Sequence, residues 1–295
     1  MKDRVIIPVL RDFLLSYNNP MKKTLIALLV CMTTYSQTIN WLNFNYPPIY
    51  ITSRPNKGLG FGDKHQNMLE DCLEQYTHKK TQALSFARIR AFLESKKGNH
   101  CIAALGGFPN EISDSFYSST VFTIPTSFIV TRRDTLEKLK LENDAISLSK
   151  LMNNKELKGA HVKGGTYGEA VSRILNTSQS QLLMKTDPDP IKFYKMLLRK
   201  RFDYALDYPI GLMYNIRALT QEQREKIAFV LIKENQQTPY INAYAICNKA
   251  PGSEIIINRI NQCMKREVHN EKLRGEILKY IPDKMKETID KINRL

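Results

Sequence analysis

The chain has 295 residues, of which 42% are hydrophobic, and a formal net charge of +15. This length suits one large domain or two lobes and is ample for a buried core. The basic residues are interleaved with acidic ones, as in Lys284-Met285-Lys286-Glu287, and the sequence has no Arg-rich tract or aromatic-basic ladder. The composition therefore indicates a solvated basic surface and argues against a nucleic-acid-binding protein.

Residues 21–36 carry the pattern of a secretory signal peptide. Lys22 and Lys23 form a short positive region, a short apolar segment follows, and Thr34 and Ser36 stand at the positions that signal peptidase reads. The apolar segment falls short of the roughly 18 residues that a membrane-spanning helix needs. We expect cleavage after Ser36 and export to the periplasm, and a short buried helix is the alternative.

This signal does not begin at the first residue, because residues 1–20 precede it. Either translation starts at Met21, or the signal has an unusually long leading region. We expect the first, so that residues 1–36 are an extension plus signal peptide and the working protein begins at residue 37.

After the signal, strand-like and helix-like patterns alternate along the chain. Apolar residues recur at helical spacing in some segments and form short extended runs in others, with Gly, Pro and Asn between them. The first part predicts a strand, helix, strand, helix and strand at residues 39–44, 66–76, 80–86, 86–97 and 101–105. This βαβαβ order predicts a parallel sheet covered by helices.

A second, similar unit follows a long extended segment at residues 120–131. Its expected elements are a helix, a strand, two helices and a strand at residues 148–158, 160–163, 169–175, 189–200 and 202–207. A returning extended segment at residues 240–248 leads to helices that begin at Ser253 and Asn270. Two α/β units joined by two long crossing segments predict a two-lobed, hinged α/β architecture.

The carboxyl ends of the predicted strands mark the candidate binding region, because ligands in open α/β sheets bind beyond these ends. The rule points to the loops at residues 43–46, 106–111 and 163–168 and to Asp207. The glycines of the third loop do not follow the GxGxxG or GxxxxGK[ST] patterns of nucleotide sites. This loop is therefore either an anion-binding cradle or a simple turn.

Four cysteines remain after the predicted cleavage, namely Cys72, Cys101, Cys247 and Cys263. In an exported protein this even number permits one or two disulfides, with three full pairings possible, and single buried thiols are the alternative. None of the four has CxxC spacing or clusters with a histidine. We therefore expect no metal site.

A series of short motifs resembles the family 3 extracellular solute-binding proteins over residues 38–290. The motifs occur in the family's order: Tyr46-Pro47-Pro48, the glycines of residues 58–62, Glu94-Ser95-Lys96-Lys97-Gly98, Phe116-Tyr117-Ser118, Leu157-Lys158-Gly159, Lys163-Gly164-Gly165-Thr166, Phe202-Asp203-Tyr204-Ala205 and Tyr244. The resemblance implies a type II periplasmic-binding-protein fold, a Venus flytrap with two crossing hinge strands. Its first lobe would comprise residues 37–127 and 241–295, and its second lobe residues 128–240.

The resemblance implies a protein that closes around a small polar solute. It implies a role with an ABC importer, or alternatively as a periplasmic sensory or interaction module with a membrane receptor. We expect a monomer without enzymatic activity, metal or cofactor, since the chain has no G-x-S-x-G, H-E-x-x-H or similar motif. The implied ligand contacts come from both lobes: Asn43, Tyr46, Gly106, Phe108, Glu111, Lys163, Gly165, Thr166, Gly168 and Asp207.

These contacts differ in their implied roles. Tyr46 would stack on the ligand and Asn43 would contact it, while backbone amides near Gly106 and Phe108 would bind anionic oxygens. Gly165, Thr166 and Gly168 would bind such oxygens from the second lobe, beside a helix N-terminus. Asp207 matches the family's acid that takes the ligand's amino group.

One departure from the family concerns the ligand carboxylate. Members that bind α-amino acids have a Thr-x-x-Arg-like pattern whose Arg pairs with that carboxylate, whereas this chain has Glu111 in the corresponding stretch. With Asp207 nearby, Glu111 favours a cationic or amine-rich ligand. Alternatively, Arg88, Arg90 or Lys163 supplies the missing charge from another direction.

Overall fold

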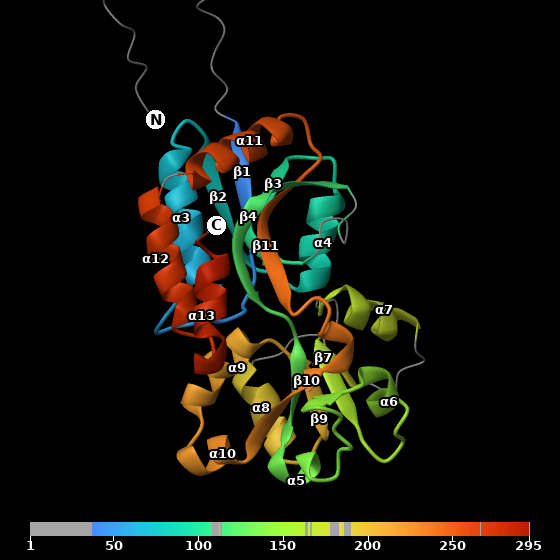
Figure 1. The fold of residues 1–295 in the computed structure, drawn as a ribbon. Helices are drawn as coiled ribbons and strands as arrows, with labels where there is room; N and C mark the ends of the chain where they lie inside the picture. Colours follow the sequence, from blue (N-terminus) through green and yellow to red (C-terminus); the bar gives the residue numbers. More distant parts are fainter. Residues whose placement is uncertain are drawn as a thin grey trace, which may run out of the picture. The chain divides into compact units, whose positions relative to one another are not determined.

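Figure 1 shows the fold of the protein in a computed structural model. The structure describes residues 37–107, 112, 114–162, 165, 167–177, 183–185, 190–265 and 267–294. Residues from Thr38 onward belong to one compact unit. The predicted signal peptide at residues 21–36 and the predicted contacts Phe108, Glu111, Lys163 and Thr166 lie outside the described residues.

The first lobe is built around a five-stranded sheet with the strand order β2-β1-β3-β11-β4. Its strands are β1 (Thr38–Asn43), β2 (Thr77–Ala83), β3 (Asn99–Gly106), β4 (Ser115–Pro125) and β11 (Tyr240–Asn248). β1 is parallel to both β2 and β3, whereas β11 is antiparallel to β3 and β4. The predicted parallel βαβαβ unit is therefore present, and the returning strand β11 lies between β3 and the edge strand β4.

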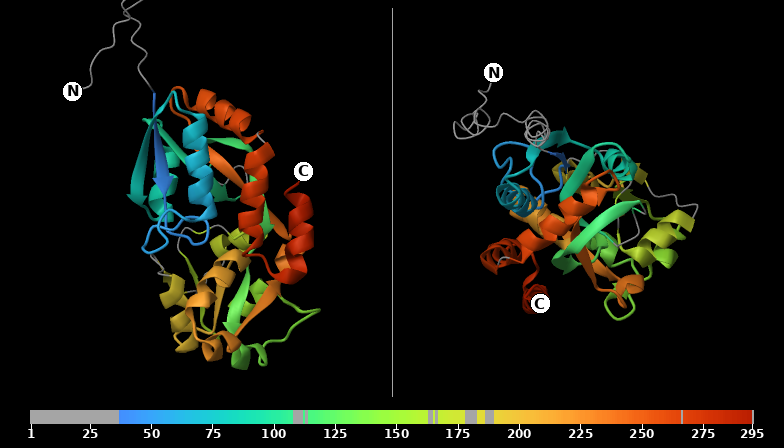
Figure 2. Two further views of the ribbon diagram at one scale, coloured as in Figure 1. Left: turned by 90° about the vertical axis from the view of Figure 1, so that its left-hand side faces the viewer. Right: turned by 90° about the horizontal axis from the view of Figure 1, so that it is seen from above.

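Helices cover both faces of this sheet, because alternate residues of β1 point to opposite sides. Trp41 packs with Leu69 of α3 and Ile256 of α11, whereas Leu42 packs with Ile89 of α4. The C-terminal helix α12 lies beside α3, and α13 lies beside α12 (Figure 2). The helices of this lobe are α3 (Phe61–Cys72), α4 (Phe86–Glu94), α11 (Ser253–Met264), α12 (Glu267–Leu278) and α13 (Asp283–Ile292).

Helix α3 begins five residues earlier than the expected start at residue 66. The carboxylate of Asp63 accepts hydrogen bonds from the backbone N–H groups of Gly60 and Ile51, at 3.0 and 2.9 Å, and so starts the helix at Phe61. Gly62 lies inside this helix, and the position requires glycine because a Cβ there would come within 2.6 Å of the Ile49 side chain. The glycines thus permit close packing of the helix start as well as a turn.

The second lobe is built around a six-stranded sheet with the order β6-β10-β5-β9-β7-β8. Its strands are β5 (Phe128–Arg132), β6 (Ala145–Ile146), β7 (Gly159–Val162), β8 (Leu183–Lys185), β9 (Tyr204–Asp207) and β10 (Ile227–Ile232). Its helices are α5 (Arg133–Leu136), α6 (Leu148–Met152), α7 (Glu169–Thr177), α8 (Pro190–Leu198), α9 (Pro209–Asn215), α10 (Gln221–Glu225) and the 3₁₀ turns η1 (Ile216–Ala218) and η2 (Lys233–Asn235).

The central strand β5 packs helices on both faces of the second sheet. Phe128 and Val130 contact the core formed with α8 and α9, while Ile129 between them contacts the core formed with α6 and α7. This alternation is the period-2 pattern of a buried strand.

The chain passes between the two sheets at two adjacent points. At the first, Thr126 and Ser127 separate β4 from β5, and at the second, residues 233–239 separate β10 from β11. The two crossings are hydrogen-bonded, because Thr126 N–H donates to the Pro239 carbonyl and Asn235 Nδ2 donates to the Ser127 carbonyl, both at 2.9 Å. The long segment expected at residues 120–131 is therefore two strands joined at this hinge.

Two disulfides join distant parts of the first lobe. Cys72 of α3 is bonded to Cys263 of α11, and Cys101 of β3 is bonded to Cys247 of β11. The sequence left this pairing open, since it depends on which helices and strands lie side by side. Each bond ties the N-terminal part of the lobe to its C-terminal part.

In the part of the chain that the structure describes, no helix is both long enough and apolar enough to cross a bilayer. Among the same residues, no group of three or more His, Cys, Asp or Glu side chains is placed to hold a metal ion.

Candidate functional site

Tyr46 and Asp207 meet at the junction of the two lobes, although they are 161 residues apart in the sequence. Tyr46 follows β1 of the first sheet, and Asp207 is the last residue of β9 in the second sheet. The Tyr46 hydroxyl donates a hydrogen bond of 2.9 Å to Asp207 Oδ1. The carboxyl end of a strand in each sheet thus contributes to one site.

The turn after β1 fixes the position of Tyr46. Tyr46 N–H donates to the Tyr50 carbonyl at 3.0 Å, and the Tyr46 carbonyl accepts from Ile49 and Tyr50 N–H groups. The Tyr46 ring also stacks on Phe44, with the ring centroids 6.3 Å apart. The hydroxyl of Tyr46 is therefore held towards the second lobe by both backbone and ring contacts.

Asp207 accepts hydrogen bonds from neutral groups. Besides Tyr46, the Tyr194 hydroxyl of α8 donates to Oδ2, and the backbone N–H of Tyr208 donates to Oδ1 at 2.7 Å. Burial raises the pKa of Asp207, and these three donors oppose that rise. Burial, with the charge of Asp207 next, raises the pKa of Tyr46 and Tyr194, so both remain hydroxyl donors.

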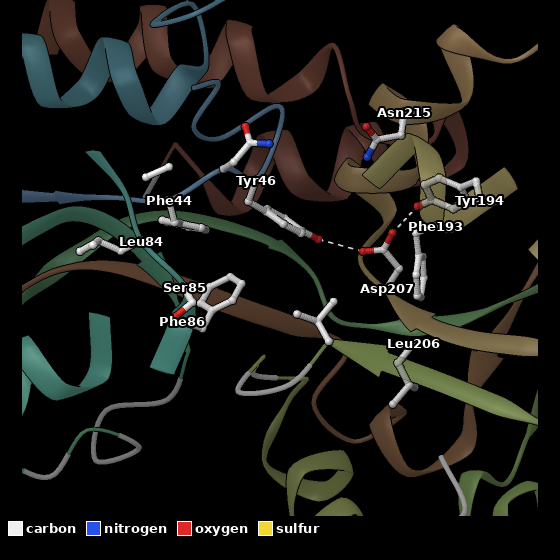
Figure 3. A pocket seen from close by; sticks show the side chains of 13 residues that line it. Phe44, Tyr46, Leu84, Ser85, Phe86, Phe193, Tyr194, Leu206, Asp207 and Asn215 are labelled. Carbon is white, nitrogen blue, oxygen red and sulfur yellow. Dashed lines mark hydrogen bonds between the residues drawn. The ribbon is translucent and has the colours of Figure 1, made fainter. Parts of the chain in front are cut away.

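A cavity of about 200 Å³ lies beside this carboxylate. Figure 3 shows Phe44 and Phe86 on the first-lobe side of the cavity and Phe193 and Tyr194 on the second-lobe side. A second cavity of about 60 Å³ is lined in part by the same side chains of Tyr46, Phe86 and Asp207. The site is thus an aromatic chamber with a carboxylate in its wall.

Gly211 of α9 makes room for the contact between the lobes. A Cβ at this position would lie 2.9 Å from the Tyr46 hydroxyl oxygen and 3.2 Å from Asp207 Oδ1. Any larger residue would therefore press on both members of the hydrogen-bonded pair. Pro209 occupies the first position of α9, so Gly211 belongs to the first turn of that helix.

Comparisons with known proteins give matches in fold. No protein-family model matches the sequence, and no curated protein matches it. A mutant of ArgBP from T. maritima is 12% identical, with a TM-score of 0.61 over 85% of this chain and 98% of that chain. The amino acid ABC transporter substrate-binding protein AbpA from Streptococcus pneumoniae, bound to L-arginine, is 14% identical, with a TM-score of 0.58 over 90% and 98%. The periplasmic VFT2 domain of Bordetella pertussis BvgS is 14% identical, with a TM-score of 0.58 over 83% and 92%.

The chain has the fold of a periplasmic solute-binding protein. The two-lobed α/β architecture expected from the sequence is thereby confirmed. Of these neighbours, AbpA is described as a substrate-binding protein and the BvgS match as a periplasmic VFT2 domain. At this level of identity the likeness concerns the fold, so the binding site must be argued from the residues of this chain.

In this binding-protein fold, Gly106 and Gly165 line the smaller cavity together with Asp207. Gly168 directly precedes α7, with a φ of 100°, and its carbonyl accepts the Ser172 N–H of that helix. Asn43 lines neither of these two cavities; its N–H and its Nδ2 donate to Thr81, at 3.0 and 3.4 Å. Its neighbour Asn45 lines the larger cavity instead.

Tyr167 shapes the described part of the loop between β7 and α7. Its hydroxyl accepts the Val162 N–H at 2.7 Å, and a Cβ at Gly165 would lie 3.0 Å from that hydroxyl oxygen. The Tyr167 ring stacks on Tyr208, with an angle of 9° between the rings. The Tyr167 hydroxyl is thus the hydrogen-bond acceptor for one backbone N–H at the end of β7. The sequence had predicted that backbone N–H groups of this glycine-containing loop bind the ligand.

Sequence reasoning missed several side chains of the chamber, among them Phe86, Phe193, Tyr194 and Asn215. Phe86, Phe193 and Tyr194 occupy expected helices, in which apolar and aromatic residues are ordinarily assigned to the core. For Phe193 and Tyr194 the available signal was their helix α8, which directly precedes the strand β9 that ends at Asp207. Asn215 lies at the C-terminal end of α9, a helix that was not predicted.

Proposed function

We propose that this protein is a periplasmic solute-binding protein that captures a small, polar, amine-bearing solute between its two lobes. The observation that carries the proposal is the hydrogen bond between Tyr46 and Asp207 beside an aromatic cavity. Contributions from both lobes to one site are what a hinged binding protein needs, because a ligand that contacts both lobes favours their closure.

The proposed ligand contacts divide by chemistry. Asp207 accepts a hydrogen bond from the ammonium group of the solute, and the Tyr46 ring packs against its body. Backbone groups at Gly106, Gly165 and Gly168 contribute polar contacts around them. Three further predicted contacts extend this proposed set, namely Asn43, Phe108 and Thr166, whereas Lys163 remains a prediction that would favour a ligand carboxylate. Glu111 remains a prediction that disfavours a ligand carboxylate.

The proposed partner is an ABC importer, to which the monomeric protein delivers its solute in the periplasm. The signal-like residues 21–36 and the solute-binding fold support this placement. A sensory role with a membrane receptor is the second candidate, and it is favoured by the BvgS domain and by a histidine kinase sensor domain among the structural neighbours. Chemical cross-linking in native membranes separates the two, since it would join the protein either to a permease or to a receptor.

A thermal-shift screen over amino acids, polyamines, sugars and short peptides tests the proposal. A cationic or amine-bearing solute should raise the melting temperature of the wild-type protein, and Asp207→Ala should abolish that rise. Glutamate and glutamine should bind no better than cationic solutes. An unchanged ligand response in Asp207→Ala, or preferred binding of an acidic amino acid, would contradict the proposed role of the carboxylate.

A further inference from the structure

The charges around the cavity bear on the class of solute, provided that the proposed solute-binding function holds. Among the residues that the structure describes, Asp207 is the one charged side chain on either cavity wall, and no Lys, Arg or His lines them. A ligand carboxylate in such a chamber would meet Asp207 without a described cation to pair with it, and an unpaired buried charge is strongly disfavoured.

The aromatic side chains favour a cation with an apolar body. Ring faces carry negative electrostatic potential and attract ammonium groups, while ring edges and faces also bury apolar carbon. Here Phe44 and Phe86 approach the cavity from the first lobe, and Phe193 and Tyr194 approach it from the second lobe (Figure 3). A protonated amine with an alkyl or aryl body matches both properties of the wall.

Asn215 contributes a second acceptor oxygen to the wall of the larger cavity, which Asp207 also lines. It lies one helical turn after Gly211 on α9, lines the larger cavity, and is 3% exposed. Its Nδ2 donates to the Gly211 carbonyl at 2.8 Å, whereas its Oδ1 has no hydrogen-bond partner among the described residues. A buried acceptor without a hydrogen-bond donor lowers stability, so we expect a donor group of the bound ligand to satisfy this oxygen.

Asp207 retains room for one more donor. A carboxylate offers about four acceptor positions, and the protein fills three of them, with Tyr46 and Tyr208 on Oδ1 and Tyr194 on Oδ2. An ammonium group carries N–H donors and no acceptor, so it suits acceptor oxygens such as Asp207 Oδ2 and Asn215 Oδ1, which belong to two residues of the same cavity wall. A quaternary ammonium group has no N–H and would leave Asn215 without a partner.

We propose that this site selects a small primary amine that has an apolar body and no carboxylate, and that Asn215 acts with Asp207 to bind its ammonium group. The cavity of about 200 Å³ is smaller than the roughly 300–1,000 Å³ of typical ligand pockets. The ligand is therefore small. Asn215 distinguishes a primary amine from its fully methylated counterpart, and Asp207 with the aromatic wall distinguishes the amine from an amino acid.

Calorimetric titration with three related probes tests this proposal. Phenethylamine should bind at least about tenfold more tightly than phenethyltrimethylammonium, which lacks N–H donors, and than L-phenylalanine, which adds a carboxylate; such a ratio is typical of a lost or mismatched buried polar contact. Equal or tighter binding of L-phenylalanine would overturn the proposed class and leave the solute-binding function standing. Equal binding of the trimethylated probe would overturn the role of Asn215.

Two variants of Asn215 test its role independently of the three probes. Asn215→Leu should weaken phenethylamine binding about tenfold or more and leave binding of the trimethylated probe within about twofold, because that probe has no N–H to donate to Asn215 Oδ1. Asn215→Ala, which is smaller, should behave alike and replaces Asn215→Leu if that variant does not fold. Unchanged phenethylamine binding in a folded variant would overturn the role of Asn215. Absence of binding by every probe and by the wider screen would overturn both the class and the proposed function.

Discussion

At the scale of single residues, Asp207 is the group in which stability and function oppose each other. Burial raises its pKa, so the folded state favours its protonated form. Stability from this group is therefore fully present below the ordinary pKa of 3.8 and is lost as the pH rises through the folded pKa. At neutral pH the buried, ionised carboxylate therefore lowers the stability of the unliganded protein, as is common for binding residues.

Asp207→Asn should therefore raise the melting temperature of the unliganded protein at neutral pH and weaken its response to amines. Each kcal/mol gained corresponds to about 2–4 °C in a chain of this size. The asparagine can keep the contacts to Tyr46 and Tyr194 without a buried charge. Thermal unfolding with and without ligand measures both effects.

Asp203 provides a matched control on the same strand region. Its carboxylate pairs with the buried guanidinium of Arg132 at 2.9 Å and also accepts the Lys158 N–H. Asp203→Asn should lower stability by about 1.5–3 kcal/mol, because it removes one of the two carboxylates that pair with the buried Arg132 and leaves only Asp134, at 3.1 Å. A fall in stability for Asp207→Asn comparable to that of Asp203→Asn would contradict the claim that ionised Asp207 destabilises the unliganded protein.

Ligand binding should weaken as the pH falls. The amine stays protonated throughout, with an ordinary pKa of about 10, whereas Asp207 loses its charge when it is protonated. Because its pKa is raised, the loss of affinity should begin at a higher pH than the value of 3.8 for an ordinary aspartate would give. Calorimetry between pH 4 and pH 8 measures this, and an affinity independent of pH over that range would argue against the ionised carboxylate as the acceptor.

At the scale of elements, helix α9 places two residues at the site. Gly211 leaves space for the Tyr46 hydroxyl, and Asn215 lies one turn later on the same helix. Gly211→Ala should weaken ligand binding about tenfold, because the new Cβ would lie 2.9 Å from the Tyr46 hydroxyl oxygen and displace it. Calorimetric titration of the variant measures the effect.

The control is Gly275→Ala in α12, where a Cβ would meet no atom within 4 Å. Alanine there should leave ligand affinity unchanged and raise stability by up to about 1 kcal/mol through its helix propensity. If both alanine variants bind ligand as the wild type does, Gly211 does not control the position of Tyr46.

The disulfide between α3 and α11 should matter for stability and little for the site. Replacing Cys72 and Cys263 together by serine should lower the free energy of unfolding by about 2–5 kcal/mol, since the bond closes a loop with a sequence separation of 191 residues. Ligand affinity should stay within about twofold, because neither helix lines the two cavities beside Asp207. Urea unfolding and titration of the double variant measure these two quantities, and a large loss of affinity would show that α3 and α11 control the site.

Local patterns predicted most elements, and their failures have physical causes. Periodicity predicted α4 and α8, but the start of α3 depends on Asp63 and on the close approach of Gly62 to Ile49. The short helix α9 was missed because its packing around Tyr46 and Asp207 decides its position. Propensity describes a segment by itself, whereas such contacts come from elements distant in the sequence.

At the scale of the whole molecule, the order of α/β units and two crossing segments predicted a two-lobed binding-protein fold, which the structural neighbours confirm. The same order predicted that strand ends carry the candidate site. It did not predict that Tyr46 of one lobe would donate to Asp207 of the other, or that Tyr194 and Asn215 would join them. Contacts across a hinge depend on how two sheets face each other, and a one-dimensional pattern does not specify that arrangement.

The central claim is that one solute is held by both lobes at Tyr46 and Asp207. A double-mutant cycle with Tyr46→Phe and Asp207→Asn, read by calorimetric titration of the best amine, tests it most directly. Each single variant should lower affinity, and the combined loss should differ from the sum by at least about 0.5 kcal/mol, since the two side chains share a hydrogen bond and a ligand. Affinities that stay at the wild-type value in all three variants would contradict a solute site at the junction of the lobes.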